Sequence, residues 1–153
     1  MKKKIIIIVV SVLLVIAAAV SVILVLNNRP FKISYNSNFG PEIIDTAVPE
    51  LETLTAEHKS FLVFVTQPEC SAADVLEESI QEIISDTDLQ VYKISFMYLR
   101  DTDIASGVRH YPSLLIFKNG QLLTYLDPTS DDDTDAFMNS TDLRKWLEKY
   151  IIL

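Results

Sequence analysis

Cysteine is almost absent from this chain, which has one, Cys70, among its 153 residues. A disulfide needs two cysteines, so none can form within the chain, and the fold has to be stabilised by buried side chains. No zinc-type cluster of cysteine and histidine ligands is present in the sequence either. The leftover thiol is therefore a candidate for reactive chemistry.

Glycine and basic residues are also scarce. The chain has 3 glycines and no Gly-rich phosphate loop, and no serine, histidine and aspartate order typical of a hydrolase. We therefore expect no cofactor and no bound metal. The chain carries 13 basic and 21 acidic residues, for a net charge of −8. Such acidity repels nucleic acid and anionic lipid surfaces, so neither is an expected partner.

An apolar run near the start of the chain contains no charged residue. It extends over Ile5–Leu26 and, at about 1.5 Å of rise per residue, is long enough to cross the roughly 30 Å of a bilayer core. Lys2, Lys3 and Lys4 precede it and predict a cytoplasmic N-terminus. The sequence thus predicts a single-pass protein of the cell membrane whose remainder, of net charge −11, lies on the extracytoplasmic side.

Cleavage of this segment is the alternative interpretation. Ala17–Ala19 fits a signal-peptidase site, but the run continues apolar through Val20–Leu26, where a cleavable signal would turn polar. The length of the run favours an uncleaved anchor. A lipid-modified cysteine anchor is excluded, because no cysteine lies near the segment.

The remainder of the chain alternates between strand and helix patterns. After a linker at 27–30, a single domain is expected over 31–153, as an α/β three-layer sandwich with a mixed sheet. Strands are expected at Phe31–Tyr35, Ser60–Val65, Asp88–Phe96, Ser113–Phe117 and Gln121–Leu126. Helices are expected from Pro49, from Ser71, over Asp101–Arg109, and from Ser140 or Thr141. The last two strands should form an antiparallel hairpin at Asn119-Gly120.

Cys70 follows the second expected strand by way of Thr66–Glu69 and directly precedes a helix. In that helix, Ser71 and Asp74 match a capping box, with Ser71 as the N-cap residue. The unpaired N–H groups at a helix N-terminus favour the thiolate form of a nearby cysteine, while the carboxylate of Glu69 opposes it. The position three residues on, where a dithiol site needs its second cysteine, is Ala73.

The order of elements and two motifs resemble the thioredoxin superfamily. Tyr111–Gly120 is similar to the family segment I-P-T-x-x-x-F-x-x-G, and Phe64–Cys70 is similar to the P-x-C-x-x-C variant of small thioredoxin-like proteins of Gram-positive bacteria, bacteriocin transport accessory proteins included. The resemblance covers Phe31–Leu153 and implies that Pro112 is cis and faces Cys70. It also implies that extended protein segments bind beside Pro112, with Tyr111, Ser113, Glu69 and His110 as binding residues.

This sequence departs from the family pattern at three positions. Ala73 replaces the resolving cysteine, Glu69 replaces a frequent aromatic residue, and Leu62-Val63 offers no counterpart of the family's buried aspartate. Without a resolving thiol, a mixed disulfide at Cys70 can be released only by a thiol from outside the chain. Two functions remain open, namely monothiol exchange or isomerase activity through Cys70, with Pro112 in the site, and a non-catalytic binding module.

Three further patterns have competing interpretations. His110 could pair with Cys70 or point to solvent, and His58 shares a helix stripe with Leu51 and is expected to be a packing residue. A run of oxygen-bearing residues matches part of a calcium-loop spacing, but Ala136 stands where that loop needs glycine, so a solvated acidic loop is favoured. The matching residues are Asp131, Asp133, Asp135, Asn139 and Asp142.

Overall fold

The computed structural model describes residues 13–18 and 29–153. Contacts divide the chain into two units, Met1–Pro30 and Phe31–Leu153. Most of the predicted membrane segment Ile5–Leu26 lies outside the described residues, and the part that is described, residues 13–18, is helical. The described part of the chain contains no helix that is both long and apolar enough to cross a membrane.

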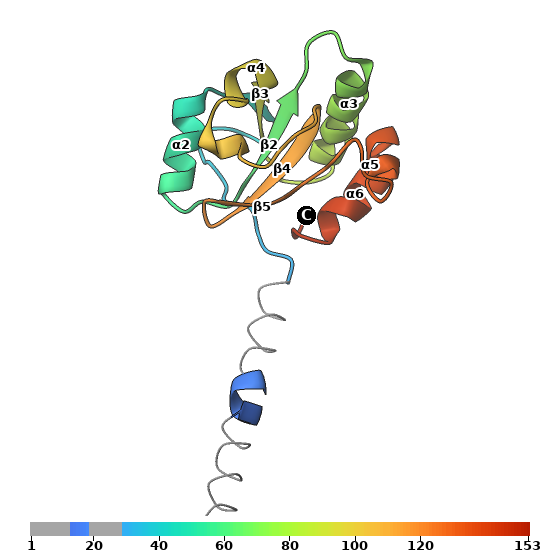
Figure 1. Ribbon diagram of the computed structural model, residues 1–153. Coiled ribbons are helices and arrows are strands. Elements are labelled where there is room, and N and C mark those ends of the chain that lie inside the picture. Colours follow the sequence, from blue (N-terminus) through green and yellow to red (C-terminus); the bar gives the residue numbers. More distant parts are fainter. Residues whose placement is uncertain (1–12, 19–28) are drawn as a thin grey trace, which may run out of the picture. The chain divides into compact units, whose positions relative to one another are not determined.

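A mixed five-stranded sheet forms the centre of the second unit, with its strands in the order β1-β3-β2-β4-β5 (Figure 1). The bounds are β1 Ile43–Asp45, β2 Phe61–Thr66, β3 Val91–Ser95, β4 Ser113–Lys118 and β5 Gln121–Tyr125. The first three strands are mutually parallel, and β4 runs antiparallel to both β2 and β5. The predicted α/β architecture with a mixed sheet is therefore confirmed.

Helices cover both faces of this sheet, as Figure 1 shows. On one face lie α3 (Ser71–Ser85), α5 (Thr134–Met138) and α6 (Ser140–Glu148), and on the other lie α2 (Val48–Ala56), α4 (Phe96–Leu99) and the 3-10 helix η1 (Asp103–Ala105). The central strands feed both layers because successive side chains point to opposite faces. Within β2, Leu62 and Phe64 join the α3 side, and Phe61, Val63 and Val65 join the α2 side.

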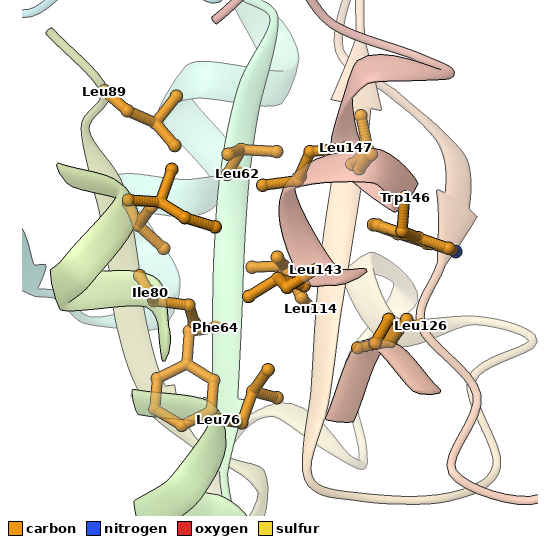
Figure 2. Close-up of a cluster of buried hydrophobic side chains, with 14 of the residues drawn as sticks. Leu62, Phe64, Leu76, Ile80, Leu89, Leu114, Leu126, Leu143, Trp146 and Leu147 are labelled. Atoms are coloured by element: carbon orange, nitrogen blue, oxygen red, sulfur yellow. The ribbon is translucent and has the colours of Figure 1, made fainter. Parts of the chain in front are cut away.

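The larger apolar core lies between the sheet and α3, α5 and α6. The apolar stripe of α3 is buried in it, and the apolar stripe of α6 supplies Leu143, Trp146 and Leu147, as Figure 2 shows in part. The α3 stripe consists of Leu76, Ile80, Ile83 and Ile84. These helices form because apolar residues recur every three to four positions and can be buried together on one side.

The first strand lies at a different place from the predicted one. Phe31–Tyr35 is not a ladder strand, since Phe31 makes only an isolated bridge to Ile151. The edge strand is instead Ile43–Asp45, which pairs in parallel with β3. The alternation of apolar and polar residues in Phe31–Tyr35 does reflect one half-buried face, because Phe31 and Ile33 pack against the larger core. The segment does so without forming a strand ladder.

Two helix predictions are also corrected. The helix expected over Asp101–Arg109 is replaced by α4 and η1, because the Ser95 hydroxyl accepts a hydrogen bond from the Met97 N–H and caps a helix that starts earlier. Gly107, at φ 94°, then interrupts any continuation. His58 is not a packing residue, because α2 ends at Ala56 and His58 is an exposed turn residue with φ 54°.

The hairpin between β4 and β5 confirms the Asn119-Gly120 turn. Both residues have positive φ, 52° for Asn119 and 78° for Gly120. The Gly120 N–H donates to the Lys59 carbonyl at 2.7 Å, which ties the turn to the segment between α2 and β2. A Cβ atom on Gly120 would collide with the Thr55 carbonyl, so glycine is required for both backbone angle and space.

We expect Gly120→Ala to destabilise the domain by at least about 1 kcal/mol, because it combines a left-handed φ with a backbone collision. Urea denaturation monitored through Trp146 measures the change. Gly40→Ala is the control, since a Cβ at Gly40 meets nothing within 4 Å and its φ is ordinary. Equal stability of the two variants would contradict this account of the turn.

Candidate functional site

The ends of three strands and the start of a fourth bring the predicted site residues to one edge of the sheet. The strands β2, β3 and β5 end there, and the antiparallel β4 begins there, with Val65 paired to Ser113. Gln67–Cys70 leaves β2 at this edge, and Tyr111-Pro112 enters β4 at it. We call it the Cys70 edge. The resemblance implied that Cys70 and Pro112 lie at the same end of the sheet, and the structure places both residues there.

Pro112 is held firmly at the start of β4. The Tyr111–Pro112 peptide bond is cis, as the resemblance implied, and Pro112 is buried. The next residue, Ser113, has no exposed surface, and its hydroxyl donates a 2.7 Å hydrogen bond to the Leu126 carbonyl at the end of β5. The Pro112 loop is therefore fixed to the sheet by a buried side chain rather than left to solvent.

Cys70 is the N-cap residue of α3. Its backbone is extended, with φ −116° and ψ 110°, and its carbonyl accepts hydrogen bonds from the N–H groups of Ala73 and Asp74 at 2.9 and 3.4 Å. The predicted capping box is therefore wrong, because Ser71 is already the first helical residue. The thiol is half-buried and packs against the larger core, next to the first unpaired N–H groups of a 15-residue helix.

The residue before the thiol has an unusual backbone conformation. Glu69 has φ 57°, in the left-handed region that residues other than glycine seldom adopt, and its side chain is exposed. Such conformations cluster at functional sites, where the surrounding structure imposes them. The reversal lets the chain turn from β2 into α3 within a short loop and leaves the Glu69 carboxylate beside Cys70 in solvent.

Tyr111 connects the Pro112 loop to α4. Its ring lies 5.7 Å from the ring of Phe96, centroid to centroid, and the two rings are tilted by 31°. Burial raises the pKa of the Tyr111 phenol, and the nearby Tyr125 raises it further, so the hydroxyl stays neutral at physiological pH. The loop thus presents an uncharged aromatic surface on this side.

His110 contacts the segment after β5, and no contact between His110 and Cys70 is found in the described structure. Its Nδ1 lies 3.5 Å from Asp127 Oδ1 and 3.4 Å from the Thr129 hydroxyl. The backbone N–H of Thr129 donates to the same carboxylate oxygen, and this bond, followed by one from the Thr129 hydroxyl, lowers the pKa of Asp127. His110 therefore joins the Pro112 loop to the segment that starts at Asp127.

Several residues of the calcium-loop spacing have structural roles in the fold. The predicted acidic loop contains a helix, α5, because Ala136 is buried against the larger core. Asp133 accepts one hydrogen bond from the Trp146 indole N–H at 2.9 Å and one from the Asp127 N–H at 3.0 Å. Asn139 caps α6 by accepting from the Asp142 N–H. These bonds occupy side-chain oxygens of two of the five residues in the spacing, Asp133 and Asn139.

Sequence reasoning missed three residues of this edge. Met97 and Tyr98 of α4 are 60% and 73% exposed, and Asp127 is the partner of His110. The largely apolar run Val91–Leu99 was a usable signal, because it is longer than an ordinary strand. Its second half therefore had to form a different element, which is α4. The Asp127-Pro128-Thr129 sequence is typical of an Asx-type turn, but nothing in it indicates a contact with His110.

Comparisons with known proteins identify the fold. No protein-family model and no curated protein matches the chain. Among solved structures, a mutant thioredoxin of Halobacterium salinarum matches with a TM-score of 0.57 and 22% identity, over 77% of this chain and 98% of the other. Oxidised thioredoxin of Plasmodium falciparum matches with a TM-score of 0.56 and 14% identity, over 72% of this chain and 100% of the other.

Trxlp of Edwardsiella tarda also matches, with a TM-score of 0.52 and 16% identity, over 69% of this chain and 98% of the other. The second unit therefore has a thioredoxin-like fold. Identities at this level establish the fold alone, so the function has to be argued from the Cys70 edge itself.

Proposed function

We propose that this protein is a thioredoxin-like monothiol exchange protein that acts on disulfides of partner proteins through Cys70. One observation carries the proposal, namely that Cys70 lies at the N-terminus of α3 on the sheet edge that also holds cis Pro112. The thiol lies next to the unpaired N–H groups at the start of α3, and the Pro112 loop offers fixed backbone for an extended partner segment.

The proposed reaction consists of two successive thiol–disulfide exchanges. The Cys70 thiolate attacks one sulfur of a client disulfide, so that a new S–S bond to Cys70 forms while the client bond breaks and its other sulfur leaves as a thiolate. A second client thiolate then attacks the mixed disulfide and restores the Cys70 thiolate. No electrons are gained or lost overall, and the client keeps a rearranged disulfide, which is isomerase chemistry.

Release cannot come from within this chain. The residue three positions after Cys70 is Ala73, which is 2% exposed and packs in the larger core. When the client offers no second thiol, a small external thiol has to attack the mixed disulfide, and the client is then reduced as the external thiols are oxidised. This requirement distinguishes the proposed activity from that of a dithiol oxidoreductase.

The test is capture of a model disulfide. The full chain, in a non-ionic detergent, is mixed with a peptide disulfide, the reaction is stopped with acid, and adducts are identified by mass spectrometry. We expect a mixed disulfide at Cys70, formed faster than with free cysteine at neutral pH, and none in Cys70→Ser. If the mixed disulfide at Cys70 forms no faster than one with free cysteine, the proposed exchange function is wrong.

A non-catalytic binding module is the second candidate, favoured by the exposed apolar side chains of Met97 and Tyr98 beside the Pro112 loop. In this case the partner binds through backbone hydrogen bonds and apolar contacts, and the thiol has no role. Partner binding that survives in Cys70→Ser together with a slow Cys70 thiol would favour this candidate.

We further propose that Ile5–Leu26 anchors the protein in the cell membrane, with Lys2–Lys4 in the cytoplasm and the thioredoxin-like unit outside. We expect protease added to cells without a wall to digest residues 31–153 and leave the anchor, as detected with tags at each end. Protection of the unit, with only the N-terminus digested, would reverse the orientation. A product that lacks Met1–Ala19 would indicate cleavage instead of anchoring.

A further inference from the structure

Two neighbouring apolar side chains are exposed at the Cys70 edge. Met97 and Tyr98 are 60% and 73% exposed, while Leu99 in the same short helix is fully buried. The helix α4 follows β3 directly, and the Phe96 ring packs on Tyr111 of the Pro112 loop. The exposed pair, which we call the α4 patch, therefore lies next to the loop proposed to hold a partner segment. Adjacent exposed apolar residues of this size often mark an interaction surface.

Negative charge is concentrated at the same edge. The segments Gln67–Asp74, Ser106–Pro112 and Leu126–Asp135 all enter or leave the sheet here and carry seven carboxylates against one arginine, Arg109. Asp127 and Asp133 accept the hydrogen bonds described above, and Asp135 interacts with Lys145. The other four carboxylates are exposed and make no ion pair with any described residue. They belong to Glu69, Asp74, Asp131 and Asp132.

The acidic segment is joined to the Pro112 loop by specific contacts. His110 reaches Asp127 at 3.5 Å, and the Asp127 N–H donates to Asp133 at 3.0 Å, so Asp131 and Asp132 lie in a turn fixed next to the loop. Apolar surface on the α4 side and carboxylates on the β5 side thus flank Pro112. A partner that spans the loop meets both.

We infer that the α4 patch and the acidic turn at Asp131-Asp132 form one docking surface for an extended polypeptide segment that combines apolar side chains with lysine or arginine. The inference rests on the proposed function, whose client it specifies. Apolar side chains of the partner would be buried on Met97 and Tyr98, and its basic groups would meet the carboxylates. A second copy of the chain does not fit this surface, because the part after the apolar run has a net charge of −11.

Fluorescence anisotropy with two cysteine-free peptides tests the surface. The first is a short labelled Gly- and Ser-based peptide that carries leucines and lysines, and the second is its twin with glutamate at each lysine. With the full chain in a non-ionic detergent, we expect the lysine peptide to bind about tenfold more tightly at low salt. The preference should shrink as salt is added, because exposed charges are screened.

Paired variants separate the two parts of the surface. Met97→Ser with Tyr98→Ser should weaken both peptides several-fold, whereas Asp131→Asn with Asp132→Asn should weaken only the lysine peptide. Matched controls lie at the opposite end of the sheet: Ile152→Ser removes an apolar side chain that is 52% exposed, and Asp88→Asn removes an exposed carboxylate. Neither control should change the binding of either peptide.

The outcomes distinguish this inference from the proposed function. Equal affinity for the two peptides, or equal loss in the control variants, overturns the docking surface even if Cys70 still captures model disulfides. Absence of capture with an intact lysine preference overturns the exchange function and leaves a binding surface for the second candidate. The peptides contain no cysteine, so their binding is independent of thiol chemistry.

Discussion

Ala73→Cys is expected to create insulin-reducing activity in the presence of a small dithiol, whereas the parent protein should show little. Cys70 is the N-cap residue of α3, and an N-cap side chain lies close to the backbone of the third helical residue, which is position 73, so modest adjustment would allow a disulfide. The Ala73 N–H already bonds to the Cys70 carbonyl at 2.9 Å, so the two residues share the first turn of α3. A second thiol there would release clients from within the chain.

The gain should remain modest. Ala73 is 2% exposed, so the added sulfur has to displace neighbouring core atoms, at a cost of about 1–3 kcal/mol. Activity is measured by insulin turbidity, and closure of the disulfide by the mass change on alkylation before and after reduction.

Ala72→Cys is the matched control. It adds the same thiol to the same helix turn, but residues two positions apart point to different sides, and Ala72 is exposed. We expect no internal disulfide and no insulin reduction from it. Cys70→Ser in the Ala73→Cys background should also be inactive. If Ala73→Cys closes its disulfide without exchange, and the parent captures no peptide, the binding module replaces the exchange function.

Elements with a strong local signal were predictable from the sequence. The α3 stripe repeats at helical spacing, and the Asn119-Gly120 turn is specified by two residues that tolerate positive φ, so each was determined by its own sequence. The same holds for the order of most strands and helices in the sandwich. These features depend on neighbours in sequence and need no knowledge of distant contacts.

The errors occurred where distant contacts decide. Ile43–Asp45 is a strand because Val91–Lys93 lies beside it, and three residues carry too little pattern to reveal that. Phe31–Tyr35 alternates like a strand, but its backbone bonds go to single groups such as the Ser60 carbonyl and the Tyr150 carbonyl. A short helix such as α5 likewise depends on the burial of Ala136 among residues far along the chain.

The candidate site divides in the same way. Cys70 and Pro112 are predictable because each has a motif, and the topology then places both at one edge. The partner of His110 is not predictable, since Asp127 lies in a segment with several equally acidic residues. Exposure of Met97 and Tyr98 was also hidden, because an apolar run predicts burial and nothing in it distinguishes these two residues from the buried Leu99 that follows them.

Phe64→Ala should produce the largest loss of stability, about 3–5 kcal/mol, against a total of about 5–15 kcal/mol that is typical of a domain. Phe64 has no exposed surface and lies between β2 and α3, near Leu76 and Ile80 (Figure 2). Truncation removes an aromatic ring from a close-packed layer and leaves a cavity that the sheet cannot close by moving. Urea denaturation of the full chain measures the change.

Val75→Ala is the control for this variant. Val75 lies on α3, the helix that packs over Phe64, but it is 40% exposed, so its truncation should change the free energy of unfolding by only about 0.5 kcal/mol.

A second measurement links the core to the site. Cys70 and Ala73 pack in the same apolar cluster as Phe64, so a cavity there removes packing beneath the first turn of α3. We therefore expect Cys70 to be alkylated faster in Phe64→Ala than in Val75→Ala under conditions where both are folded. Equal rates would mean that the thiol is positioned by its loop alone, without support from the core.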